Sequence, residues 1–355
     1  MPCKLAITSI SLGRCFAGHP LSRRLDLARS YGYHGIEMFY EEIVHIAQQL
    51  PGGLTQANQL EAARIIGGMC RKRRLTILCL QPFWHFEGLL DRQEHDKRLV
   101  ELSFWFQLAK ALDTNMVQIP SNFLPASRLL NDTALVVADL RKAANMGLRE
   151  RPPIRFVYEA LCWGTHCDVW EKSWEIVRAV DRPNFGLCLD TFNIAGRIYA
   201  DPAAPTARTP DCREAIQKSL KRLTSTVDVR KVFGVQIVDA ERLAKPLIQG
   251  HEFYDAEQPS RMSWSRNCRL FYGEKDRGAY LPVTEISRAI FQGLGFEGWV
   301  SMEVFHRRMS DADESVPREL AQRGAVAWEK LVRDMGLLVE GVDTAPGLKY
   351  AGRQG

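Results

Sequence analysis

The amino-acid sequence predicts a (β/α)8 barrel, an α/β fold in which eight parallel strands alternate with helices. Two observations carry this prediction. Eight short apolar runs recur along the 355 residues, and stretches with helical periodicity separate them. The first strand–helix turn has no G-x-G-x-x-G, which argues against a doubly wound nucleotide-binding sheet. The length alone would suggest two domains, but barrels of this size commonly remain single domains.

The predicted strands are short runs of β-branched and other apolar residues, as expected for strands covered on both faces. In chain order they span 4–11, 35–39, 75–81, 116–119, 154–159, 185–190, 232–236 and 299–303. The segments between them carry apolar residues three or four positions apart, which lie on one face of a helix. In chain order these helices span 20–31, 58–74, 94–112, 132–146, 169–180, 211–227, 283–294 and 317–335.

Two connections, 194–210 and 241–282, are too long for simple turns. The second follows the seventh strand and contains Trp264, Phe271, Tyr272 and several arginines, so we expect a long lid loop that folds over the barrel mouth. The sequence therefore predicts a single barrel domain over 1–335, with the lid inserted at 241–282. A Gly-rich C-terminal tail follows over 336–355.

Composition restricts the class of protein. With 46% hydrophobic and 25% charged residues the chain is neither disordered nor fibrous. No apolar run reaches the ~20 residues that a membrane helix needs, so we expect no membrane partner. The net charge of +5 is spread along the chain, and the densest basic run, 71–74, ends a predicted helix, so we expect no nucleic-acid partner.

The nine cysteines are an odd number and lie mostly in apolar runs, which predicts reduced thiols. The N-terminus shows no signal-peptide pattern, so a soluble, cytoplasmic protein is expected. The oligomeric state is left open, a homo-oligomer included.

The candidate chemistry lies at the ends of the last four strands, because the C-terminal ends of barrel strands meet at one mouth. These strands end in Glu159, Asp190, Gln236 and Glu303. Burying a carboxylate without a positive partner costs free energy, and one divalent cation would compensate the three carboxylates together. Three carboxylates and an amide oxygen suit Mg2+, Mn2+ or Co2+ better than Zn2+. Open coordination positions would accept substrate oxygens, and the metal would polarise a carbonyl.

These strand ends resemble those of the xylose-isomerase-like barrels, which include sugar isomerases, epimerases, inosose dehydratases and endonuclease IV. Within that superfamily, YEALCWG at 158–164 and LCLDTFNI at 187–194 are similar to the fungal 3-dehydroshikimate dehydratases of quinate catabolism. The runs at 7–13, 35–41 and 80–83 agree with this. The resemblance covers nearly the whole chain.

The resemblance implies a hydro-lyase that removes water from 3-dehydroshikimate and aromatises the ring to protocatechuate. It also implies one divalent metal ion held by the four strand-end residues. This chain departs from the bacterial relatives at one position, since they often carry His three residues after the strand-six Asp, where Asn193 stands here. A base assigned to that His therefore cannot be transferred.

Three residues are candidates for the group that removes the proton. His85 and His166 follow the third and fifth strands, and Glu37 ends the second. The substrate carboxylate calls for an arginine at the mouth, because a guanidinium pairs with it through two hydrogen bonds. The side chain of Trp163 is a candidate to pack against the flat ring of the substrate. The candidate arginines are Arg14, Arg197, Arg266 and Arg269.

A metal-dependent sugar or sugar-phosphate isomerase or epimerase is the alternative, because it uses the same proton abstraction beside a carbonyl. Its pocket would carry polar groups for a polyol instead of an arginine and an apolar wall. DNA repair of the endonuclease IV type is disfavoured, because the chain has Gln236 where a zinc-binding His might stand and has no pronounced basic face. Three buried acids argue against a non-catalytic sensor.

Overall fold

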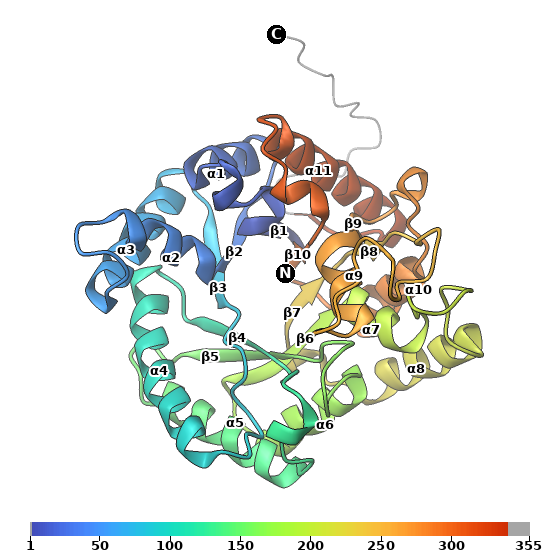
Figure 1. Ribbon diagram of the computed structural model, residues 1–355, viewed down its shortest axis with the longest axis horizontal. Coiled ribbons are helices and arrows are strands. Elements are labelled where there is room, and N and C mark those ends of the chain that lie inside the picture. The colour runs from blue at the N-terminus through green and yellow to red at the C-terminus, as the bar shows by residue number, and fades with distance from the viewer. Residues whose placement is uncertain (1, 340–355) are drawn as a thin grey trace.

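The computed structural model describes residues 2–339, so residues 340–355 of the predicted tail lie outside the described residues. Eight parallel strands close into a barrel in the order β1-β10-β7-β6-β5-β4-β3-β2, which confirms the predicted fold. Figure 1 shows the helices as a ring around these strands. The strands are β1 (Lys4–Thr8), β2 (Gly35–Phe39), β3 (Thr76–Gln81), β4 (Met116–Pro120), β5 (Arg155–Glu159), β6 (Phe185–Asp190), β7 (Val232–Gln236) and β10 (Trp299–Met302).

The eight predicted helices are present, with ends that shift by a few residues. They are α1 (Leu21–Ser30), α3 (Gln56–Lys72), α4 (Arg92–Ala111), α5 (Thr133–Leu148), α6 (Trp170–Val180), α8 (Cys212–Thr226), α10 (Val283–Arg288) and α11 (Val316–Met335). The helix expected over 283–294 is divided, since a π-helical turn at 289–293 follows α10. The first strand ends at Thr8 and not at residue 11, because a 3-10 turn begins at Ser9.

Three further helices were not predicted. They are α2 (Tyr40–Gln49), α7 (Thr191–Ile198) and α9 (Ser260–Cys268). The first two begin directly after β2 and β6, where no turn residue separates strand from helix. Asp190 begins α7 as its N-cap, with Oδ1 accepting from the backbone N–H of Phe192 at 2.6 Å.

The segment 241–282, expected as a lid loop, is mostly turns and irregular structure but holds short regular elements. It contains α9 and one strand of a small antiparallel sheet, β8 (Asp239–Ala240) with β9 (Arg269–Leu270). The Trp264 ring packs on Phe192 of α7, with ring centroids 4.8 Å apart, and is fully buried. Figure 1 places α9 beside the central strands, next to α7. The segment therefore forms one wall of the barrel mouth.

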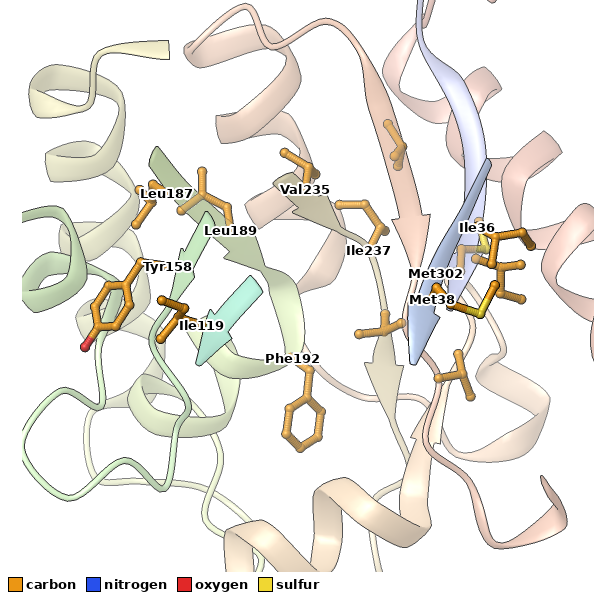
Figure 2. Close-up of a cluster of buried hydrophobic side chains, with 14 of the residues drawn as sticks. Ile36, Met38, Ile119, Tyr158, Leu187, Leu189, Phe192, Val235, Ile237 and Met302 are labelled. Atoms are coloured by element: carbon orange, nitrogen blue, oxygen red, sulfur yellow. The ribbon is translucent and has the colours of Figure 1, made fainter. Parts of the chain in front are cut away.

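Successive side chains of a strand point to opposite faces, so the barrel strands divide their residues between two environments. Figure 2 shows part of the apolar set, including Leu187 and Leu189 of β6 and Val235 of β7. Intervening positions are polar or small, and Cys188 and Gln236 are examples. The polar strand ends are thus held in place by an apolar layer packed around them.

The nine cysteines are buried and form no disulfide, as predicted. Among the described helices, none combines the length and apolar character needed to cross a membrane. The predicted limits of the barrel domain, 1–335, stay a prediction.

Candidate active site

Three of the four predicted metal ligands lie together. Glu159, Asp190 and Glu303 each contribute one oxygen to a cluster in which these atoms lie within 4.8 Å of one another. All three side chains are buried, at 2–3% exposure. Their strands bring them together, because β5, β6, β7 and β10 are neighbours in the closed barrel. The cluster can hold a metal ion.

The fourth predicted ligand, Gln236, is fully buried at the end of β7 and pairs in register with Asp190 of β6. Its Nε2 donates to Glu37 Oε2 at 3.1 Å. Its Oε1 accepts only a long contact of 3.6 Å from the thiol of Cys188. The amide oxygen thus retains capacity for another partner.

The electrostatics of the cluster favour a cation. Burial, followed by the negative charge of Asp190, raises the pKa of Glu159 to about 8. Burial and the charge of Glu159 raise the pKa of Glu303 well above its ordinary value. One guanidinium, that of Arg269, opposes both effects and leaves the three acids undercompensated. A divalent cation fits this all-oxygen donor set, since it would supply the missing positive charge.

Arg269 is the central cation of the site. It is fully buried, and its Nη1 donates to Asp190 Oδ2 at 2.9 Å and to Glu303 Oε2 at 3.2 Å. Its guanidinium lies 4.3 Å from the ring centroid of Phe192 and 4.8 Å from that of Phe305. Within residues 2–339 its Nη2 has no hydrogen-bond partner.

Two amides orient the carboxylates, and neither was predicted to do so. Asn193 Nδ2 donates to Glu159 Oε1 at 2.7 Å and to Asp190 Oδ2 at 2.9 Å. Gln118 Nε2 donates to Glu159 Oε2 at 2.7 Å. Asn193 thus joins two of the three acids through its amide hydrogens. The helix-start pattern that begins at Asp190 was the signal that could have placed Asn193 beside it.

A cavity of about 330 Å³ opens over the cluster at the C-terminal end of the barrel. Glu159, Glu303 and Trp163 line it. Its remaining wall is rich in aromatic rings and in residues of the 241–282 segment. These include Phe39, Trp84, Phe123, Phe305, Met262, Ser265, Arg266 and Arg269.

The four candidate arginines differ in their position relative to the mouth cavity. Arg14, Arg266 and Arg269 line this cavity, whereas Arg197 does not. Arg197 Nε instead pairs with Asp168 at 2.7 Å and is partly exposed to solvent. The geometry thus gives no support to a substrate contact by Arg197, because its charge is already neutralised outside the cavity.

The three candidate bases lie in different surroundings. His85 does not itself line the mouth cavity, but its ring packs against that of Phe123, which does, with centroids 4.4 Å apart. His166 lines a separate cavity of about 40 Å³ together with Glu87. Glu37 lies beneath the cluster, where its Oε2 accepts from Thr8 Oγ1 at 2.8 Å and from Gln236 Nε2.

Comparison with known proteins identifies the class. Residues 25–330 match the family of xylose isomerase-like TIM barrels, and the chain belongs to this family. A solved xylose isomerase-like TIM barrel/4-hydroxyphenylpyruvate dioxygenase fusion protein superposes with a TM-score of 0.71 at 25% identity. The match covers 94% of this chain and 43% of that one.

Two relatives carry the same name. The chain is 58% identical over 347 residues to a 3-dehydroshikimate dehydratase of Neurospora crassa, which covers 96% of this chain and 97% of that protein. It is 28% identical to a 3-dehydroshikimate dehydratase of Pseudomonas aeruginosa over 81% of this chain. The chain spans only 36% of the length of the bacterial relative.

Proposed function

We propose that the protein is a metal-dependent 3-dehydroshikimate dehydratase, a hydro-lyase that converts this small-molecule substrate to protocatechuate. The main evidence for this reaction is the 58% identity to the Neurospora crassa dehydratase, which extends over nearly the full length of both chains. The buried carboxylate cluster beneath an aromatic-lined cavity supports it. A cytoplasmic location and the absence of a nucleic-acid partner are part of the same proposal.

The ion would be held by Glu159, Asp190 and Glu303, with Gln236 Oε1 as the fourth ligand. The donor set favours Mg2+, Mn2+ or Co2+. When bound, such an ion supplies Lewis-acid polarisation of the substrate ketone. Asn193 and Gln118 hold Glu159 in place through their amide hydrogens, so their role is to position a ligand.

The substrate carboxylate would be bound by Arg266. Arg14 is neutralised by Glu41 through two hydrogen bonds, and Arg269 by the acids of the cluster. In the described structure, Arg266 has no carboxylate at ion-pair distance and donates only to Gln258 Oε1 at 2.8 Å. Burial lowers the pKa of Arg266, and the charge of Asp255 opposes this effect only in part. An incoming carboxylate would therefore stabilise the guanidinium.

Replacing Arg266 with methionine is expected to raise KM for 3-dehydroshikimate about 10–100-fold with little change in kcat. The reason is the loss of a charge-assisted hydrogen bond of about 1.5–3 kcal/mol. Steady-state kinetics measures the effect, and Arg197→Met is the matched control with unchanged KM. A normal KM for Arg266→Met would show that the carboxylate binds elsewhere.

Of the three candidate bases, His85 has the most suitable hydrogen bonding. Its Nδ1 lies 3.2 Å from Asn122 Oδ1, which can only accept, so Nδ1 carries the proton. Its Nε2 has no hydrogen-bond partner in the part of the chain that the structure describes, so it can take a proton. Burial lowers the pKa of His85, which keeps the ring neutral near pH 7. We therefore assign proton abstraction to His85 Nε2.

A His85→Gln variant is expected to lose about 10²–10⁴-fold in kcat and to lose the acidic limb of its kcat/KM–pH profile. The loss of the limb follows because this limb would report protonation of Nε2. The matched control is His166→Gln, which should retain the limb. The assignment fails if the two variants have the same pH profile.

The function is tested by product analysis. Metal-supplemented protein is incubated separately with 3-dehydroshikimate and with a ketohexose, and the products are separated by chromatography. Protocatechuate from the first and an unchanged ketohexose support the dehydratase. An isomerised or epimerised hexose with no protocatechuate would instead support the sugar isomerase or epimerase.

A further inference from the structure

A second and larger cavity, of about 540 Å³, opens at the opposite, N-terminal end of the barrel. Its walls come from the barrel strands and from the loops that precede β4 and β5. We propose that this cavity is a binding site for a small organic anion, a carboxylate attached to a flat apolar body. The site is separate from the candidate active site and does not depend on the proposed reaction.

The cavity exists because the barrel interior is incompletely filled. Barrels of this class usually fill their axis with layers of bulky branched side chains. Here Cys79, Gly234 and Ser301 line the cavity from three different strands, and all are small. Glu37 and Gln118 form its upper end, and Gln118 also lines the mouth cavity. These two side chains therefore separate the two cavities along the axis.

Arg155, at the start of β5, supplies the charge that would bind the anion. Its guanidinium lies 4.0 Å from the ring centroid of Phe233 and lines the cavity. Among the described residues no carboxylate lies within ion-pair distance of it, and burial lowers its pKa. A partly buried guanidinium without an anion is costly, and a bound carboxylate would offset that cost through two hydrogen bonds.

The other charged side chains at the opening keep the cavity positive. Lys110 pairs with Glu150 at 2.5 Å, so its charge is already balanced. Arg151 donates to the backbone carbonyls of Leu148 and Glu150, and no carboxylate of residues 2–339 lies at ion-pair distance from it. Arg151 therefore adds a second uncompensated cation at the rim.

The acidic side chains of the lining do not cancel this charge. Asp113 is a lining residue, and its carboxylate lies 3.7 Å from the guanidinium of Arg71, which is not part of the lining. Glu37 lies at the inner end of the cavity, where it accepts hydrogen bonds from Thr8 and Gln236. The opening therefore favours a single negative charge on the ligand.

The aromatic walls define the rest of the ligand. Phe233 and Trp299 line the cavity and give it an apolar wall, against which the edge or face of a flat apolar ring can pack. The volume lies within the range of about 300–1,000 Å³ typical of small-molecule sites. Benzoate, with one carboxylate and one ring, is the simplest probe of this chemistry.

The test is calorimetric titration of benzoate into Arg266→Met protein, whose mouth site is weakened, and into the same protein with Arg155→Met added. We expect saturable binding at one site per chain, weakened at least about tenfold by Arg155→Met, the loss expected for a charged hydrogen bond. Arg155→Lys should recover part of the affinity. Thermal melting checks that each variant is folded.

Two further titrations test whether the aromatic wall contributes to binding. Phe233→Leu retains Arg155 and should weaken benzoate binding, while inorganic phosphate, which has no ring, should bind at least about tenfold more weakly than benzoate. The proposal is overturned if benzoate does not bind the Arg266→Met protein. It is also overturned if Arg155→Met binds benzoate with unchanged affinity.

Discussion

Replacing Glu159 or Glu303 with glutamine is expected to lower kcat/KM for 3-dehydroshikimate by at least about a thousandfold, because each change removes an anionic ligand from the candidate metal site. Glutamine has nearly the same shape as glutamate, so packing is kept. Burial, followed by repulsion within the cluster, raises the pKa values of both acids. Glu159 accepts amide hydrogens at both oxygens, and Glu303 pairs with the buried Arg269. Each glutamine variant loses one of these interactions, so without metal it should fold but melt at a lower temperature than the parent protein.

Each variant is assayed well below its melting temperature, where the folded state is populated, to separate a functional role from a structural one. A side chain needed only for folding would leave kcat/KM nearly unchanged under this condition. The matched control is Glu175→Gln, an exposed carboxylate on α6. Activity above about a tenth of the parent value, with metal in excess, would contradict the assignment of Glu159 or Glu303 as a ligand.

The second large effect is expected at Arg269. In the metal-free protein, Arg269→Met leaves Asp190 and Glu303 buried without their cation, which should lower the free energy of unfolding by about 3–5 kcal/mol. A bound divalent ion would replace much of the lost positive charge, so excess Mn2+ should restore much of the difference. Urea unfolding with chelator and with Mn2+ measures both quantities.

Arg269→Lys is the comparison, since it keeps one positive charge and should lose less stability than Arg269→Met. Equal stability of Arg269→Met and the parent protein in the presence of chelator would contradict the account. So would an equal loss with chelator and with Mn2+, because the charge of the ion would then have no effect on the cluster.

The barrel and the carboxylate cluster were predictable because each depends on a local pattern. An apolar run of four to six residues that ends in Glu or Asp predicts both a strand and the position of its last side chain. Closure of eight parallel strands then brings Glu159, Asp190 and Glu303 together, as the structure shows. No information beyond chain order was needed for these three residues.

The partners of these acids were not predictable, because they depend on contacts between segments far apart in the chain. Arg269 lies 79 positions after Asp190, and the sequence could not separate it from three other candidate arginines. Gln118 carried no signal of its own, because a polar residue inside a strand has many explanations. The contacts of Asn193 were not predicted because α7, which begins directly after β6 without a turn residue, was not predicted.

We expect this barrel to dehydrate 3-dehydroshikimate with the help of a divalent ion bound at the carboxylate cluster. The most direct measurement follows the ultraviolet absorbance of protocatechuate after mixing purified protein with 3-dehydroshikimate, once with added Mg2+ or Mn2+ and once after chelation. Protocatechuate should form when metal is added and should not form after chelation. Undiminished product after complete chelation would contradict the role of the metal, and no product under either condition would contradict the proposed reaction.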